Sequence, residues 1–119
     1  IAGSHLSNVL HKPKRFNGND LYENDESIEV PDINANRNDY KILSWEIKAG
    51  DAIAFDFRTL HGASENVNKL SRRRIFSARI VGDDAFFVDR GGKGSPPFEN
   101  IKLKTGDKLL GEEFPIIYQ

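Results

Sequence analysis

Cysteine and methionine are both absent from the 119 residues of this sequence. Without cysteine the chain can form neither disulfide bonds nor thiolate metal sites, which fits a reducing compartment, and we expect a cytoplasmic protein. Without methionine it carries no start residue. We therefore interpret residues 1–119 as the C-terminal portion of one longer domain.

An excess of charge of one sign is missing as well. The 17 Lys and Arg residues nearly balance the 18 Asp and Glu residues, and the formal net charge is −1. This balance provides no electrostatic attraction to nucleic acid or to anionic lipid. No apolar run approaches the roughly 20 residues that a membrane-spanning helix needs. We expect neither a nucleic-acid partner nor a membrane.

Helical periodicity is equally scarce, and alternation takes its place. Apolar residues alternate with others along 42–47, 52–60 and 72–81, and residues 85–89 form a shorter extended piece. Turn-forming Gly and Asp residues separate these segments. Several short strands with turns between them are typical of a β-sandwich or barrel, so we expect an all-β fold.

A long polar stretch at residues 13–37 precedes the predicted strands. It is rich in Asn, Asp and Glu and has few apolar residues, which predicts a surface loop. Loops of this length in compact domains are often lids or binding loops. A solvated insertion without a role is an equally good interpretation.

His61 stands at the end of the strand predicted at 52–60. Under the two-residue period of a strand it shares a face with Ile53, Phe55 and Phe57, a bulky apolar set that we expect to point inward. An inward imidazole at a strand end is a candidate metal ligand. A core histidine beside a turn is the simpler interpretation, and no pattern connects the two other histidines to His61.

Three consecutive arginines, Arg72, Arg73 and Arg74, open the next predicted strand. Such residues are usually solvated, but alternation directs at least one of them to the inner face. An inward guanidinium near a metal calls for a carboxylate partner, because its planar fork matches two oxygens. A metal with an inward arginine suggests a chelating 2-oxo acid, and 2-oxoglutarate fits best because it has a second carboxylate.

Several segments in this order resemble the C-terminal half of the phytanoyl-CoA dioxygenase family. The segments that carry the resemblance are AGSH (2–5), AGD (49–51), HGASEN (61–66), RRIFSAR (73–79), GDDA (82–85), GKGSPPF (92–98), GDKL (106–109) and FP (114–115). Only residues 13–37 fall clearly outside it.

The resemblance implies an Fe(II)- and 2-oxoglutarate-dependent oxygenase on a double-stranded β-helix, a jelly-roll or cupin-like fold. This chain would form the C-terminal part of that barrel. The family holds iron with a His-X-Asp pair and a distal histidine, which leaves positions for 2-oxoglutarate and O₂. His61 matches the distal histidine, whereas the His-X-Asp pair should lie upstream and is not in this sequence. We therefore expect the chain alone to be inactive. A half barrel also exposes apolar strand edges, so we expect the chain to need its missing N-terminal half or a partner copy to be stable.

The resemblance also implies a 2-oxoglutarate arginine, placed four positions before a serine. Counting back from Ser77 gives Arg73, and counting forward from the histidine gives Arg72. Arg74 shares its face with the more apolar Phe76, so we prefer Arg73 and keep Arg74 as the alternative. A non-catalytic jelly-roll binding or structural domain that binds no iron is the alternative function. The substrate is expected to be a small molecule of unspecified identity.

Overall fold

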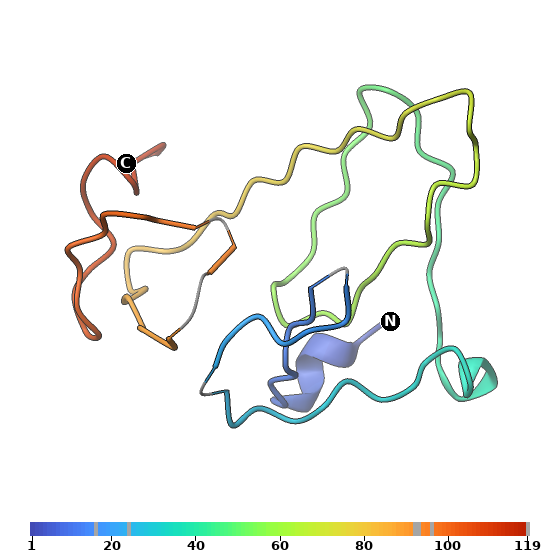
Figure 1. The fold of residues 1–119 in the computed structure, drawn as a ribbon, viewed down its shortest axis with the longest axis horizontal. Coiled ribbons are helices and arrows are strands. Elements are labelled where there is room, and N and C mark those ends of the chain that lie inside the picture. The colour runs from blue at the N-terminus through green and yellow to red at the C-terminus, as the bar shows by residue number, and fades with distance from the viewer. Residues whose placement is uncertain (16, 24, 92–93, 96, 119) are drawn as a thin grey trace.

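The computed structural model describes residues 1–15, 17–23, 25–91, 94–95 and 97–118 (Figure 1). Helical structure in these ranges is limited to two 3₁₀ turns, η1 (Ser4–Ser7) and η2 (Arg37–Asp39). No β-sheet forms among the described residues, and β-pairing is limited to isolated bridges. The same part of the chain contains no helix long and apolar enough to cross a membrane.

The strands predicted at 42–47, 52–60, 72–81 and 85–89 are not formed as strands in this structure. A strand is held by hydrogen bonds to a neighbouring backbone. The backbone bonds that residues 42–85 make with one another are turns spanning three residues, such as Asp51 N–H to Lys48 O at 3.1 Å. The segments at 42–47, 52–60 and 72–81 are therefore extended but unpaired (Figure 1), whereas the 85–89 segment makes one isolated bridge, between Phe86 and Lys108.

The described residues include no buried hydrophobic core. The chain exposes 11074 Å², whereas a compact protein of this mass exposes about 6,500 Å². Its radius of gyration is 16.5 Å, against about 13.5 Å for a compact chain of this length. The structure is therefore open, and much apolar surface meets solvent.

The apolar face that was predicted to point inward is among the exposed surfaces. Ile53 is 41% exposed, Phe55 52% and Phe57 79%. His61 is exposed too, so the prediction that it lies on a buried face is wrong for this structure. The physical reason is that no second layer of described residues covers this side of the 52–60 segment.

Residues 13–37 are irregular, as predicted, but they are bonded to the segment before them. Lys12 N–H donates to Ile28 O at 2.9 Å, and Ile28 N–H donates to Leu10 O at 3.0 Å. Glu29 accepts ion pairs from Lys12 at 3.3 Å and from Lys14 at 2.9 Å. The polar loop is thus a hydrogen-bonded unit.

The N-terminal end folds back onto the middle of the chain. η1 lies between Gly3 and Asn8, whose φ angles of 74° and 55° are left-handed and end the turn at both sides. Ala2 N–H donates to Lys41 O at 2.9 Å, and the Ile1 nitrogen donates to Leu60 O at 2.8 Å. η1 therefore lies beside the turn that leads to His61 (Figure 1).

Candidate functional site

A tight turn at residues 56–59 precedes His61. Asp56 Oδ1 accepts the Arg58 backbone N–H at 2.9 Å, and Thr59 N–H donates to Asp56 O at 2.9 Å. An Asp side chain that bonds the backbone two residues on is a standard turn-forming contact. This turn directs the chain toward η1 just before the histidine.

The Arg58 side chain reinforces the turn electrostatically. Its Nε donates to Asp56 Oδ1 at 3.0 Å and its Nη2 donates to Oδ2 at 3.1 Å, a fork on both carboxylate oxygens. These bonds lower the pKa of Asp56 to about 2, with a smaller contribution from the nearby His5. The carboxylate is therefore ionised far below neutral pH, and the turn persists across the physiological range.

The His61 ring is oriented by two contacts. Its Nδ1 lies 2.8 Å from Thr59 O, and its ring centroid lies 4.5 Å from that of Phe55. A carbonyl oxygen can only accept, so Nδ1 carries a proton, and in the neutral ring Nε2 then keeps its lone pair. Histidines that bind metals use this arrangement, with one ring N–H donated to a carbonyl and the other nitrogen free.

The backbone before His61 is fixed from a distant part of the sequence. Leu60 N–H donates to Ser4 Oγ at 2.9 Å, and Leu60 O accepts from the Ile1 nitrogen at 2.8 Å. Sequence reasoning missed Ser4, Asp56 and Arg58. The Asp-x-Arg spacing is a local turn signal that could have revealed the last two, whereas nothing local connects Ser4 with Leu60.

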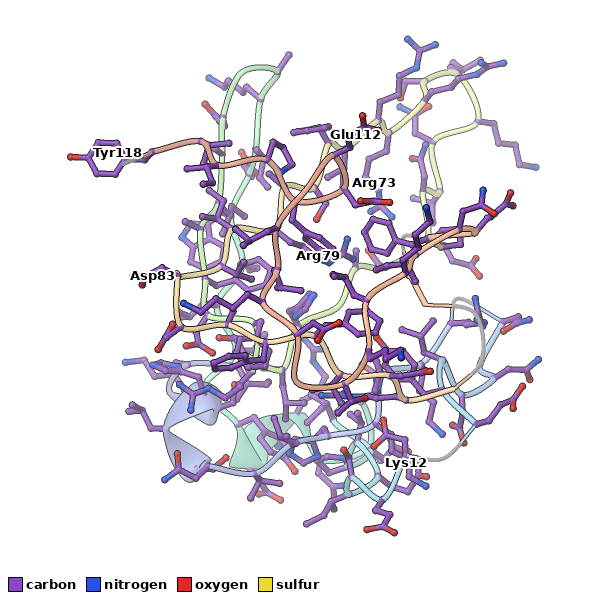
Figure 2. The ribbon with its side chains drawn as sticks, turned by 90° about the vertical axis from the view of Figure 1, so that its left-hand side faces the viewer. Lys12, Arg73, Arg79, Asp83, Glu112 and Tyr118 are labelled. Atoms are coloured by element: carbon purple, nitrogen blue, oxygen red, sulfur yellow. The ribbon has the colours of Figure 1, made fainter. Side chains whose placement is uncertain are left out.

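The three arginines lie elsewhere. Among the described residues, none of Arg72, Arg73 and Arg74 makes a hydrogen bond, ion pair or ring contact, and all three are exposed. Figures 1 and 2 place η1 at the lower end of the molecule, and Figure 2 places Arg73 toward the upper end. The structure does not bring the arginines to His61, and their predicted role stays a prediction.

The preference between Arg73 and Arg74 also stays open. It depended on the count back from Ser77 and on the two faces of the 72–81 segment having different surroundings. Ile75 is 74% exposed and Phe76 is 92% exposed, so both faces of this segment meet solvent. Neither face distinguishes one arginine from the other.

The donor set of the site is incomplete within the described chain. No group of three His, Cys, Asp or Glu side chains there lies close enough to hold a metal ion. The free Nε2 of His61 fits one imidazole position of an iron site. The sequence contains no His-X-Asp pair that could complete such a site.

Comparison with known proteins decides the family. A family model described as Phytanoyl-CoA dioxygenase (PhyH) matches residues 1–74. The chain belongs to this family. The match spans residues 2–5, His61 and residues 72–74, so the phytanoyl-CoA dioxygenase resemblance of these segments is confirmed. No curated protein and no solved structure matches the chain.

The later segments of the resemblance are not covered by this match. The motifs at 82–85, 106–109 and 114–115 follow its last residue, and so does the motif at 92–98. Within that last motif, Gly92, Lys93 and Pro96 lie outside the described residues.

Membership of the phytanoyl-CoA dioxygenase family implies a double-stranded β-helix fold and a typical use of Fe(II) and 2-oxoglutarate. The all-β expectation therefore agrees with the family. The structure of this chain shows none of the strands of that barrel among its described residues.

Proposed function

We propose that this chain is part of an Fe(II)- and 2-oxoglutarate-dependent oxygenase that hydroxylates a small molecule. One observation carries the proposal: the family match includes His61, whose Nδ1 is tied to Thr59 O at 2.8 Å so that Nε2 is available to a metal. The absence of cysteine supports a cytoplasmic location, and the near-neutral charge supports a small-molecule substrate over nucleic acid or membrane.

His61 would hold Fe(II) through Nε2 as one of three protein ligands. The other two would come from a His-X-Asp pair outside residues 1–119, supplied by a preceding segment. The chain would then act as the C-terminal portion of the domain and would be inactive alone. When bound, iron with 2-oxoglutarate and O₂ supplies the oxidation of a substrate C–H bond.

Arg73 would bind the far carboxylate of 2-oxoglutarate with its guanidinium fork, and Arg74 is the alternative. Because the polar loop at 62–71 separates these arginines from His61, this role requires the 72–74 segment to approach the histidine when the domain is complete. Completion of the fold should therefore move the 72–74 segment toward His61.

Anaerobic absorbance spectroscopy of the full-length protein tests the metal site. Fe(II) with 2-oxoglutarate should give a metal-to-ligand charge-transfer band, and His61→Ala should remove it. His11→Ala is the matched control, because the Nδ1 of His11 faces Glu29 O at 3.2 Å in another part of the chain. A full-length protein without any band would instead support a non-catalytic jelly-roll domain that binds no iron.

The arginine assignment has its own test. A charge-assisted hydrogen bond contributes about 1.5–3 kcal/mol, so Arg73→Ala should weaken 2-oxoglutarate binding by roughly 10- to 100-fold. Arg72→Ala and Arg74→Ala should leave the affinity close to that of the unmodified protein. A loss confined to Arg74→Ala would transfer the role to that residue.

A further inference from the structure

The hydroxyl of Ser4 joins two segments that are far apart in the sequence. Its Oγ donates to Ile1 O at 3.0 Å and accepts the Leu60 N–H at 2.9 Å. A serine hydroxyl has one donor and two acceptor sites, so a single side chain satisfies both partners. Ser4 and Leu60 are both half-buried at this contact.

Leu60 is thereby held through both of its backbone groups. Its N–H is taken by Ser4, and its carbonyl accepts the Ile1 nitrogen at 2.8 Å. The other backbone hydrogen bonds among residues 42–85 close local turns between residues three positions apart. This contact is therefore what ties the end of the 52–60 segment to a fixed position.

Leu60 lies between Thr59, whose carbonyl holds the histidine ring, and His61 itself. Thr59 O holds Nδ1 of His61 at 2.8 Å, and the ring itself belongs to the next residue along the chain. A fixed Leu60 backbone therefore fixes the position of the Thr59 carbonyl relative to the His61 ring. The direction of the free Nε2 then follows from the position of η1.

We infer that Ser4 is a positioning residue for His61, which it orients through the backbone of Leu60. The inference rests on the proposed function in one respect, namely that iron is the group His61 receives. Gly3 supports the arrangement, since its φ of 74° lets the chain turn immediately before Ser4. The Gly-Ser-His segment at residues 3–5 thus acts on the metal ligand without touching the metal.

Two readouts on the full-length protein test this inference. Amide hydrogen exchange at Leu60 and the ¹⁵N shifts of the His61 ring report the contact without any metal. Anaerobic titration with Fe(II) in the presence of 2-oxoglutarate reports its consequence. The variants are Ser4→Ala, the hydroxyl-retaining Ser4→Thr, and Ser7→Ala as the matched control.

Ser7 is a suitable control because its Oγ donates to Ser4 O within the same 3₁₀ turn at 2.9 Å and does not reach Leu60. Ser4→Ala should speed Leu60 exchange, move the ring shifts toward a mixture of tautomers, and weaken Fe(II) binding about tenfold, as loss of a ligand-orienting contact does. Ser4→Thr and Ser7→Ala should keep all three properties.

Unchanged Leu60 exchange and ring shifts in Ser4→Ala would overturn the inference whatever the metal does. Altered exchange with unchanged Fe(II) affinity would also overturn it, because Ser4 would then be merely structural. A full-length protein that binds no Fe(II) in any form would overturn the proposed function and the metal role of Ser4 together. The metal-free readouts distinguish that outcome from failure of the contact itself.

Discussion

The N-terminal segment, residues 1–40, and the extended segment, residues 42–85, are both irregular but differ in how they are held. In the N-terminal segment, backbone bonds reach across the chain, as between Lys12 and Ile28. In the extended segment, backbone bonds among its own residues span only three positions. The N-terminal segment is therefore held by backbone bonds between residues far apart within it, while the extended segment has no such bonds among its own residues.

The two segments differ because their residues find hydrogen-bond partners at different distances along the chain. Asn and Asp side chains bond backbone amides two or three residues on, as Asp25 does with Ser27 at 2.9 Å and Asp32 with Ala35 at 2.9 Å. Alternating apolar residues have no such local solution, since a strand needs a neighbouring strand and a covered face. Exposed apolar surface of this extent is typical of surfaces that meet another polypeptide.

The turn at Asp56 and Arg58 is a strongly ordered exception within the extended segment, and it offers the largest effect. Arg58→Gln removes the guanidinium fork, so the pKa of Asp56 should rise from about 2 toward its ordinary 3.8. Carbon-13 NMR of the carboxyl group measures this directly. Arg79→Gln is the control, and Asp56 should titrate near 2 in that variant.

The sign of the pH dependence follows from the lowered pKa. Because the carboxylate is favoured in the folded turn, its contribution is complete above 3.8, the value of an unperturbed Asp, and is lost as the pH falls through about 2. The turn should therefore survive mild acid. Disruption of the turn near pH 4 in the unmodified protein would contradict this account.

Local chemistry explains which parts of the structure the sequence predicted correctly. The turn at Gly50 and Asp51 is present, with Gly50 at a φ of 99° and Asp51 Oδ2 accepting Lys48 N–H at 2.8 Å. The irregular path of residues 13–37 is present as well. These features depend on residues within a few positions of one another, so composition and spacing suffice to predict them.

The unpredicted parts depend on distant partners. Alternation identified candidate strands at 42–81, but nothing in those residues supplies the backbone that would pair with them. The bond between Ser4 and Leu60 joins positions 56 residues apart, and neither residue carries a local signal for it. For the site, residue type and family likeness selected His61, while the position of the arginines depends on a fold that is not formed here.

Proline substitution compares the two segments directly. Ile28→Pro removes the N–H that donates to Leu10 O at 3.0 Å, and the lost bond should cost about 1 kcal/mol. The amide of Lys12, which donates to Ile28 O, should then exchange about fivefold faster. Ile75→Pro is the matched change in the extended segment and should alter no amide protection. Equal effects of Ile28→Pro and Ile75→Pro on amide exchange would contradict the difference between the two segments.

Charge substitution gives a smaller effect in the N-terminal segment. Glu29→Gln removes the ion pairs with Lys12 and Lys14, which lie at 3.3 and 2.9 Å on the surface. Exposed pairs contribute little and are screened by salt, so Lys12 exchange should increase by about twofold at low ionic strength and not at all in about 1 M salt. Glu65→Gln is the control. A salt-independent change would mean that Glu29 acts by packing and not by charge.

Within the 1–119 chain, truncation of an exposed aromatic side chain gives the smallest effect of these changes. Phe76 is 92% exposed, so Phe76→Ala should change the stability of the 1–119 chain by less than about 0.5 kcal/mol. Phe98→Ala should cost more, because that side chain is 40% exposed and its ring lies 5.2 Å from Phe114.

In the full-length protein, Phe76→Ala tests whether a second layer of residues covers the extended segment. If a second layer covers this segment there, Phe76→Ala should cost about 3–5 kcal/mol in denaturant unfolding, as for a core aromatic residue. A small cost in both proteins would mean that residues 42–85 stay uncovered, and Arg73 would then have no means of approaching His61. The stability of the Phe76→Ala variant therefore tests whether Arg73 and His61 can belong to a single site.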